Sequence, residues 1–361
     1  MIRVAFDGHF LSTPYSGNGR YTAGLLNALR SVSASYDAHV YAYGPKEATA
    51  EYALDAAVSC RRMRRVLVDV PRILKRHQVH IHHAQYTMRP DSSVVSCLTV
   101  HDTAFAQKDL PEYSPWKLLV VRYQSLRVDA IVTVSDAARV ELESLLPNRH
   151  APIHAIPNGV CISTSTESDW IAVDKMLFGL QPPHVLYVGR MARRKRVPLL
   201  VAGFRAFRRD YGGSLILVGS PDDDAAQVSE LIRGDASIRW FRDVSEGAKA
   251  ALLRMASAFA YLSRYEGFGL PVVEALRVGI PVVITETPTL TGIAGSVAIV
   301  VDPSPVAIAR GLLDAVSSAL DPGRVTDRQR VAAAYTWDRA AKTTMEMYLA
   351  LIAQGVGKWQ R

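Results

Sequence analysis

The chain of 361 residues contains only three cysteines, Cys60, Cys97 and Cys161, and no two of them lie close together in the sequence. Paired cysteines of zinc or redox sites are therefore absent, and an odd number of widely spaced thiols does not indicate a disulfide framework. The sequence also lacks the ~18–20 uninterrupted apolar residues of a membrane-spanning helix, and its N-terminus has no signal-peptide pattern. We expect reduced thiols and a cytoplasmic protein.

The composition is otherwise that of an ordinary globular protein, with 49% hydrophobic and 21% charged residues. Lysine and arginine outnumber the acidic residues by 42 to 34, which gives a net charge of +8. Such a balance permits nucleic acid, an anionic membrane or phosphorylated small molecules as partners, and it does not choose among them. The length predicts two domains, because single hydrophobic cores rarely exceed ~250–300 residues.

Short apolar runs alternate with longer amphipathic stretches along the whole chain. These runs are residues 2–6, 39–43, 94–100, 130–134, 185–188, 215–218, 258–262 and 281–284. Buried strands alternating with helices are typical of parallel β-α units, so the sequence predicts an α/β fold with doubly wound sheets. Two Rossmann-like domains facing each other across a cleft are the simplest architecture, with ligands outside the carboxyl ends of the strands.

The alternation of strands and helices is interrupted between about Pro157 and Pro183, where turn residues accumulate. We therefore expect an N-terminal domain over residues 1–165, a linker over 166–182 and a C-terminal domain over 183–335. The remaining residues, 336–361, are predicted to form a helix that crosses back to the N-terminal domain.

Glycines follow the first predicted strand, at Gly17 and Gly19, just before a helical stretch. Glycines at that point allow backbone N–H groups to approach an anion at the positive end of a helix. The pattern is not the complete G-x-G-x-x-G of dinucleotide sites, and an ordinary turn explains it equally well.

Five cations lie between the strand at 185–188 and the next helix, namely Arg190, Arg193, Arg194, Lys195 and Arg196. Cations near a helix N-terminus oppose the helix dipole, so an anionic ligand is expected there. Arginine and lysine together are well suited to bind phosphates. The alternative is a solvated basic surface.

A third segment follows the strand at 258–262 and contains two carboxylates, Glu266 and Glu274, eight positions apart. The first lies in a glycine-rich loop, and the second lies just inside a helix that Pro271 can begin. Both would project near the strand ends, where carboxylates can accept hydrogen bonds from sugar hydroxyls.

This segment resembles the E-x7-E signature of the retaining glycosyltransferases of the GT-B fold, family 4. Further matches follow in the family's order over nearly the full chain: Gly17 and Gly19, His101-Asp102-Thr103, Val134-Ser135-Asp136, Ile156-Pro157-Asn158-Gly159-Val160, Tyr187-Val188-Gly189 with Arg194-Lys195, and Val301-Asp302-Pro303. Within the family, the sequence is most similar to bacterial mannosyl-type transferases of O-antigen and exopolysaccharide assembly.

The resemblance implies roles for individual residues. Glu266 would lie beside the transferred sugar, and Glu274 would bind the ribose hydroxyls. The donor diphosphate would be held by Arg190 or Arg194 together with Lys195, and the backbone of Gly17 and Gly19 would approach it. His101, with Asp102 beside it in the sequence, would lie near the C6 hydroxyl of the donor sugar. The segment Gly267-Phe268-Gly269-Leu270 would complete the donor site.

The activity implied is transfer of a hexose, with retention, from a nucleotide diphosphate sugar to a hydroxyl of a glycan or lipid-linked glycan in cell-surface polysaccharide synthesis. We expect mannose or a related sugar from a GDP-sugar, with a UDP-sugar as the alternative, and neither a metal nor another cofactor. The histidines at 77, 80, 82 and 83 lack other metal ligands, and Asp222-Asp223-Asp224 is interpreted as a loop and helix cap.

Two other functions fit the sequence less well. A nicotinamide-dependent dehydrogenase or nucleotide-sugar epimerase would need the complete glycine fingerprint, which this sequence lacks, together with a Tyr-x-x-x-Lys pair. Tyr113 and Lys117 have that spacing, whereas Tyr123 and Tyr265 have no lysine four positions on. A nucleic-acid binder would show aromatic residues interleaved with its cations, and the basic residues here do not follow that pattern. We expect no nucleic-acid partner.

The segment 60–76 carries seven cations and one acidic residue, with Val66, Val70, Ile73 and Leu74 close to one helical face. A basic helix with an apolar stripe can bind an anionic membrane at its inner face, and it can equally pack on the sheet of its own domain. Pro71 would break the helix unless it lies in the first turn of a second one.

Overall fold

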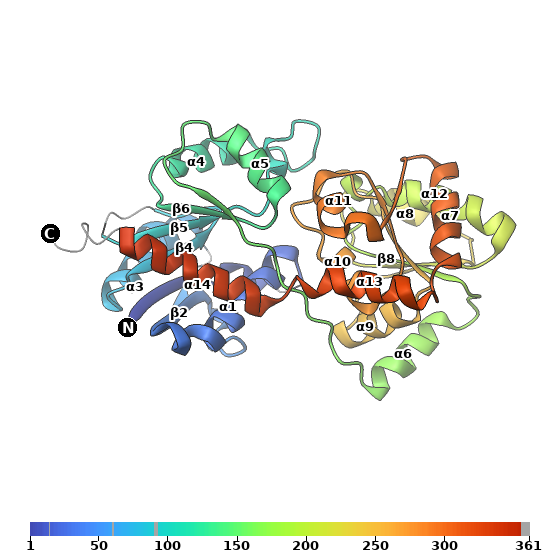
Figure 1. Ribbon diagram of the computed structural model, residues 1–361, viewed down its shortest axis with the longest axis horizontal. Coiled ribbons are helices and arrows are strands. Elements are labelled where there is room, and N and C mark those ends of the chain that lie inside the picture. The colour runs from blue at the N-terminus through green and yellow to red at the C-terminus, as the bar shows by residue number, and fades with distance from the viewer. Residues whose placement is uncertain (14, 60, 90–92, 355–361) are drawn as a thin grey trace. The chain divides into compact units, whose positions relative to one another are not determined.

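The computed structural model describes residues 1–354 except 14, 60 and 90–92, and it forms two compact units (Figure 1). Unit 1 comprises residues 1–159 together with the chain from Tyr335 onward, and unit 2 comprises residues 160–334. Each unit is built on one parallel sheet, so the predicted α/β class with two Rossmann-like domains is confirmed.

The unit boundaries differ in detail from the domains expected from the sequence. Unit 2 begins at Val160, and the segment expected to be a linker contains helix α6 (Glu167–Leu177), which belongs to unit 2. Thr166 caps α6 through a reciprocal capping box with Asp169, which is why these residues fold as a helix. Helix α14 (Trp337–Gln354) belongs to unit 1, and residues 355–361 lie outside the described residues.

The strands of unit 1 lie in the order β3-β2-β1-β4-β5-β6-β7 and all pair in parallel. Their bounds are β1 (Ile2–Asp7), β2 (Ala38–Pro45), β3 (Ala56–Val58), β4 (Ile81–Gln85), β5 (Val95–Thr99), β6 (Ala130–Thr133) and β7 (Ile153–Ala155). The helices are α1 (Gly17–Val32), α2 (Arg62–Arg64), α3 (Val70–Arg76), α4 (Pro115–Ser125), α5 (Asp136–Leu145) and α14. Strand order reverses between β1 and β4.

The strands of unit 2 lie in the order β10-β9-β8-β11-β12-β13, again all parallel. Their bounds are β8 (His184–Val188), β9 (Ser214–Val218), β10 (Ile238–Phe241), β11 (Ala258–Tyr261), β12 (Val282–Thr285) and β13 (Ile299–Val301). The helices are α6, α7 (Val197–Tyr211), α8 (Ala225–Leu231), α9 (Glu246–Met255), α10 (Leu270–Val278), α11 (Pro288–Ala294), α12 (Pro305–Ser317) and α13 (Pro322–Ala333). Strand order reverses between β8 and β11.

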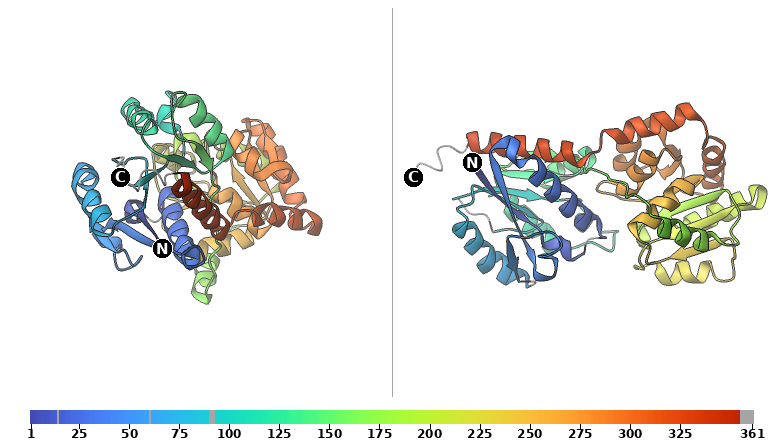
Figure 2. Two further views of the ribbon diagram at one scale, coloured as in Figure 1. Left: turned by 60° about the vertical axis from the view of Figure 1, so that its left-hand side comes forward. Right: turned by 90° about the horizontal axis from the view of Figure 1, so that it is seen from below.

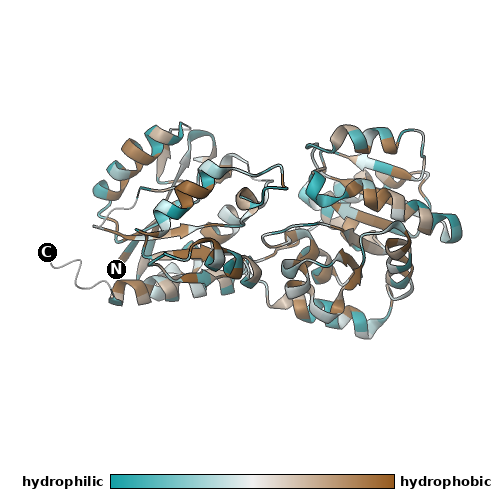
Figure 3. Cartoon of the chain, turned by 90° about the horizontal axis from the view of Figure 1, so that it is seen from above, coloured by the Kyte–Doolittle hydropathy of each residue, from teal (hydrophilic) through white to brown (hydrophobic). Residues whose placement is uncertain are grey.

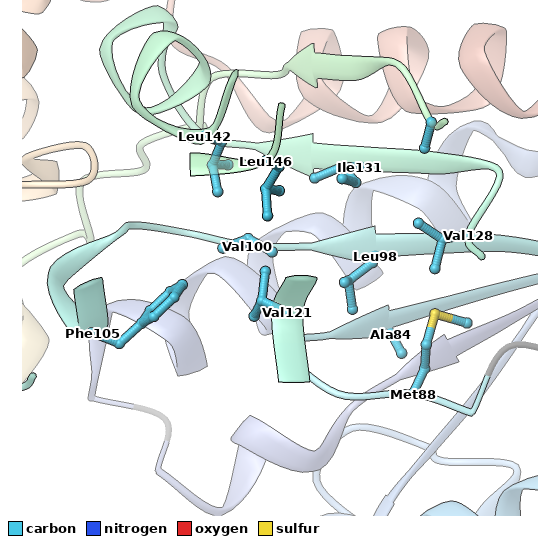
Figure 4. Close-up of a cluster of buried hydrophobic side chains, with 11 residues drawn as sticks. Ala84, Met88, Leu98, Val100, Phe105, Val121, Val128, Ile131, Leu142 and Leu146 are labelled. Carbon is cyan, nitrogen blue, oxygen red and sulfur yellow. The ribbon is translucent and has the colours of Figure 1, made fainter. Parts of the chain in front are cut away.

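Successive residues of β4 face opposite layers of unit 1, as the pleat of a strand requires. The ring of His83 contacts Tyr348 of α14, whereas Ala84 belongs to the apolar cluster beneath α4 and α5. That cluster includes Leu98, Val121 and Leu142 (Figure 4). The strands are mostly hydrophobic and the covering helices carry mixed polar and apolar faces (Figure 3). Unit 1 is therefore a sheet covered by helices on both sides.

Helix α14 lies alongside α1, although the whole of unit 2 separates them in the sequence (Figure 2). The ring of Trp337 occupies the space above Gly24 of α1, where an added Cβ atom would lie 2.1 Å from the ring. Tyr348 also reaches the sheet at His83, at 2.5 Å. The final helix is thus a structural part of unit 1.

The basic segment is helical from Arg62 to Arg76, as α2, a π-helical turn over Arg65–Asp69, and α3, while Cys60 lies outside the described residues. Pro71 lies in the first turn of α3. Val70 and Leu74 are buried in an apolar cluster with residues of the unit 1 sheet. Of the two arrangements considered for this apolar face, the structure shows packing on the sheet. In the part of the chain that is described, no helix is both long and apolar enough to cross a membrane.

Candidate active site

Both sheets bring polar loops together where their strand order reverses, which is where open α/β sheets bind ligands. In unit 2, the cationic loop follows β8 and the Glu266 loop follows β11. In unit 1, Asp7 ends β1 and Gln85 ends β4. Each unit therefore presents its own candidate site, described in turn.

The cations of the β8 loop divide into two groups. Arg190 is half exposed and pairs with Asp222 at 2.5 Å, and the backbone N–H of Arg193 donates to Asp223 at 2.7 Å. Asp224 precedes α8 without capping it through its side chain, and it lies 3.8 Å from Arg193. The three aspartates therefore form the predicted loop, with Asp224 at the N-cap position of α8, but the Asp224 side chain makes no cap hydrogen bond and the carboxylates lie beside the cationic loop.

Arg194 and Lys195 turn the other way and meet Glu266. The ammonium of Lys195 forms a buried ion pair with one carboxylate oxygen of Glu266, and Arg194 lies 3.4 Å from the other. Arg194 also donates to the Tyr265 carbonyl at 2.9 Å, and the Arg264 N–H donates to the Arg194 carbonyl at 2.7 Å. The loops after β8 and β11 are thus joined through backbone as well as side chains.

The charges of this cluster are set by burial and by one another. Burial acts to raise the pKa of Glu266, but Lys195 and Arg194 outweigh it and lower that pKa to about 2. Burial lowers the pKa of Lys195 to about 8, against the attraction of Glu266. At neutral pH the carboxylate is ionised and the lysine is mostly protonated.

Two tyrosines support this loop, and the sequence assigned no role to either, although Tyr187 lies in one of the segments that match the family. Lys195 donates to the Tyr261 hydroxyl at 2.5 Å, and the Tyr187 hydroxyl donates to the Arg190 carbonyl at 2.8 Å. The two buried rings stack with centroids 5.9 Å apart. Tyr187 lies within β8 and Tyr261 ends β11, and both strands read as apolar runs, so the sequence gives no signal for their hydroxyls.

Glu274 lies on α10 and is 1% exposed. Lys249 of α9 lies beside it, with its ammonium 3.6 Å from a Glu274 oxygen and 2.5 Å from Glu246. Lys249 was also missed, because it lies on a helix outside any motif. Glu266 and Glu274 therefore occupy separate ion-paired environments, despite their regular spacing in the sequence.

The segment between these glutamates forms the entry to α10. Gly269 adopts φ +105° at the N-cap, and Leu270 and Phe268 are buried. An added Cβ atom at Gly269 would lie 2.7 Å from Leu290, so both the backbone conformation and the space favour glycine. Gly267 precedes this turn. The N-terminus of α10 is therefore close in sequence to Glu266.

In unit 1, Gly17 and Gly19 lie inside the first turn of α1, which begins earlier than the sequence suggested. Ser16 is the reason, because its side chain accepts the Gly19 N–H at 3.0 Å and caps the helix. Gly17 is exposed, and an added Cβ atom there would meet nothing within 4 Å. The two glycines thus lie at the positive end of a long helix.

His101 is buried, and its Nε2 lies 2.8 Å from the amide oxygen of Gln85. The Gln85 amide nitrogen donates to the Asp7 carbonyl and to Thr22, which fixes the amide orientation. His101 therefore carries its proton on Nε2 and leaves Nδ1 unprotonated. Burial, followed by the charge of Lys117, lowers the His101 pKa to about 3, so the ring is neutral at pH 7.

The Asp102 carboxylate accepts the Ala104 N–H at 3.2 Å. A carboxylate–histidine pair lies nearby, between Asp7 and His9. Asp7 is 2% exposed and accepts both the His9 N–H at 3.0 Å and the His9 Nδ1 at 2.8 Å. Sequence reasoning missed this pair, although its position just after the first strand was a signal for it.

The histidines near β4 are structural. The His82 ring lies 2.7 Å from the Tyr43 hydroxyl, and the two ring nitrogens of His83 form hydrogen bonds with the hydroxyls of Tyr348 and Thr99. Among residues 1–354 with their gaps, no group of three or more histidine, cysteine or acidic side chains is placed to hold a metal ion.

The chain matches two families of known proteins over most of its length. Residues 15–164 match the family described as Glycosyltransferase Family 4, and residues 170–332 match the one described as Glycosyl transferases group 1. The O-antigen chain mannosyltransferase B of Escherichia coli is 24% identical, over 97% of this chain and 100% of that protein. Glycogen synthase of Mycobacterium tuberculosis is 26% identical, over 90% of this chain and 81% of that protein.

The fold is shared with solved glycosyltransferase structures. HepE of Anabaena, solved in complex with UDP and glucose, superimposes with a TM-score of 0.74 at 14% identity, over 97% of this chain and 100% of that one. The two parallel sheets and these matches define the class as a GT-B glycosyltransferase. The chain belongs to the family 4 glycosyltransferases and is similar to bacterial mannosyltransferases. This membership decides against a dehydrogenase or epimerase.

Proposed function

We propose that the protein transfers a hexose, with retention of anomeric configuration, from a nucleotide diphosphate sugar to a hydroxyl of a glycan or lipid-linked glycan. The observation that carries the proposal is the buried cluster of Arg194, Lys195 and Glu266 at the strand-order reversal of unit 2. Two cations held at such a position are suited to bind a diphosphate, and a carboxylate beside them is suited to bind sugar hydroxyls.

In this proposal Lys195 and Arg194 bind the diphosphate, and the half-exposed Arg190 is the third cation within reach. Gly267, Phe268, Gly269 and Leu270 form the turn at the N-terminus of α10, whose N–H groups favour an anion. Glu274, further along the helix, accepts hydrogen bonds from the ribose hydroxyls, with Lys249 holding its carboxylate in place.

Transfer breaks the bond between the anomeric carbon and the donor phosphate oxygen, and the electron pair leaves with the nucleoside diphosphate. The acceptor oxygen bonds to the same face of that carbon, and its proton passes to the departing phosphate. Glu266 is a poor nucleophile for a double displacement, because two cations neutralise it. Front-face transfer is therefore the mechanism we favour, with catalysis by positioning and by stabilisation of the leaving charge.

Unit 1 contributes further residues to the proposal. The N-terminus of α1 begins at the exposed Gly17, where a backbone N–H is suited to a phosphate, while Gly19 is buried and its N–H already donates to Ser16. His101 is a neutral ring with an unprotonated Nδ1, so it can accept a hydrogen bond from a hydroxyl of the donor sugar. Asp102, which follows His101 in the sequence, is proposed as a catalytic residue together with His101 and Glu266.

The donor and the biological role are proposed from similarity. A GDP-sugar carrying mannose or a related hexose is favoured because of the likeness to O-antigen mannosyltransferases, which also supports a role in cell-surface polysaccharide synthesis. A UDP-sugar is the alternative, since HepE binds UDP. No metal is required in this proposal, because Arg194 and Lys195 neutralise the diphosphate.

Peripheral contact with an anionic membrane at the inner face of the cytoplasmic membrane is a separate part of the proposal. The start of the basic helix leaves Met63, Leu67 and Val68 exposed by 68%, 47% and 37%, among several arginines. Exposed apolar residues flanked by cations are suited to an anionic lipid surface. The double variant Met63→Ser/Leu67→Ser should abolish low-salt sedimentation with vesicles of ~30% anionic lipid, and absence of sedimentation in the unaltered protein would refute the contact.

The function is tested by calorimetry against GDP, UDP and ADP, followed by transfer assays with sugars of the tightest nucleotide. The double variant Arg194→Ala/Lys195→Ala should weaken nucleotide binding by roughly 2–4 kcal/mol, because two charge-assisted contacts are lost. Arg208→Ala/Arg209→Ala, on the exposed face of α7, is the matched control. If both double variants bind the nucleotide with equal affinity, the cluster of Arg194, Lys195 and Glu266 does not bind the diphosphate.

A further inference from the structure

Two cations from different helices converge on consecutive residues just after β4 in unit 1. The Lys117 ammonium of α4 lies 3.7 Å from the ring centroid of Tyr86, and Arg62 of α2 donates to the hydroxyl of Thr87. The donor cluster of unit 2 does not include any of these residues. The gathering of charge at the carboxyl end of the unit 1 sheet therefore needs its own explanation.

Tyr86 is held in a conformation that ordinary side chains rarely adopt, with φ +55°. Its ring lies among Phe10 at 6.2 Å, His101 at 5.4 Å and Phe105 at 6.5 Å between centroids. An aromatic ring in such a setting is suited to stack on a sugar, and backbone strain of this kind concentrates at binding sites.

The cations are close enough to oppose one another. Burial and then Arg65 lower the pKa of Arg62, while burial lowers the pKa of Lys117, with Arg62 adding to that effect and Asp102 and Glu112 opposing it. Like charges gathered at a partly buried position destabilise the empty protein and favour an anionic ligand. Asp102 attracts Lys117 more strongly than Arg62 repels it, so this carboxylate is one of the charges around the site.

We propose that Arg62, Lys117 and Tyr86 form a binding site for a phosphate group carried by the acceptor, with the adjoining sugar stacked on Tyr86. The arginine fork and the lysine point charge together suit a phosphate, whose oxygens accept from several donors at once. This inference rests on the proposed function and specifies its acceptor as a phosphate-bearing glycan.

The test is calorimetric binding of three probes to the full chain without nucleotide: mannosyl octyl phosphate, the neutral octyl mannoside, and octyl glucuronide, which carries a carboxylate. The phosphate probe should bind at least 10-fold more tightly than the neutral one, and this ratio should collapse in Lys117→Met and in Arg62→Gln. Arg127→Gln is the matched control, because Arg127 also lies over a tyrosine ring, Tyr123 at 4.0 Å, but on the exposed surface.

Charge-preserving variants, Lys117→Arg and Arg62→Lys, should keep the phosphate preference, and they serve if the neutral variants do not fold. Equal binding of all probes, a preference for the carboxylate probe, or indifference to both cations would overturn the site. The proposed function fails separately, through lack of nucleotide binding and transfer in the unaltered protein. If the unaltered protein lacks nucleotide binding and transfer but still prefers the phosphate probe, the anion site exists and its role in binding a glycosyltransferase acceptor is rejected.

Discussion

The Lys195 ammonium and the Glu266 carboxylate form an ion pair whose side chains are only 7% and 8% exposed. The lysine that is proposed to bind the donor diphosphate is thus occupied by an internal carboxylate in the structure. A donor phosphate must share or replace that carboxylate. This competition makes the ion pair the most informative place to perturb the site.

Replacement Glu266→Gln should lower transfer by about 100-fold while nucleoside diphosphate binds more tightly, because Lys195 and Arg194 lose their competing anion. Breaking a buried pair should also cost about 3–5 kcal/mol of stability without ligand. The rise in Tm caused by nucleotide should therefore exceed that of the unaltered protein. Calorimetry and thermal melts check both effects, and weaker nucleotide binding would contradict the competition.

Replacement Tyr261→Phe removes the hydroxyl that accepts from Lys195 but keeps the stacked ring. We expect a stability loss of about 1 kcal/mol, the worth of an ordinary hydrogen bond, together with weaker nucleotide binding. The control is Tyr187→Phe, which removes a bond to the Arg190 carbonyl and leaves Lys195 untouched. If both variants bind nucleotide equally, Tyr261 has no specific effect on the lysine.

The stability of unit 1 should fall on acidification because of its buried histidines. Burial lowers the pKa of both His83 and His101 to about 3, whereas the unfolded chain binds these protons near the ordinary pKa of about 6.5. Their contribution is complete above about pH 6.5 and is lost as the pH falls from there toward about 3. Each histidine adds a slope of up to about 1.4 kcal/mol per pH unit.

Urea unfolding at several pH values measures this slope. His101→Asn should reduce it, whereas replacement of the exposed His150 by Gln should leave it unchanged. An identical pH dependence in all three proteins would show that His101 is not buried in its neutral form.

The contact between Gly159 and Trp337 should not tolerate a side chain. An added Cβ atom at Gly159 would lie 2.1 Å from the backbone nitrogen of Trp337, which cannot move without displacing α14. We expect Gly159→Ala to cost at least about 2 kcal/mol. Gly292→Ala, in α11 with nothing within 4 Å, should change stability by less than about 1 kcal/mol. Denaturant unfolding of both variants tests the difference.

The predicted apolar runs all correspond to strands of the structure, since buried parallel strands are rich in apolar residues. Strand β4 is not among these apolar runs, although it lies at the centre of the unit 1 sheet, because His82, His83 and Gln85 make it polar. The partners that satisfy these side chains include Tyr43 and Tyr348, which are 39 and 265 residues away. No local pattern contains that information.

The candidate site was predictable where residue type and position coincide within a loop, as for Arg194 and Lys195 after β8 and for Glu266 after β11. Tyr261, Lys249 and the Asp7–His9 pair were not, because their importance comes from contacts between segments that only the fold brings together. The spacing of Glu266 and Glu274 indicated the family, but it did not show their different partners. Glu266 pairs with Arg194 and Lys195 from the loop after β8, and Glu274 lies beside Lys249 of α9.

The position of α14 has a consequence for biosynthesis. Unit 2 is one uninterrupted stretch of chain, whereas unit 1 needs its first and last segments together. As the ribosome extends the chain, the face of α1 that receives Trp337 and the side of β4 that receives Tyr348 stay open until residues 335–354 emerge. Unit 2 can therefore complete its core first, and residues 1–159 must wait for residues 335–354 before unit 1 can complete its own core.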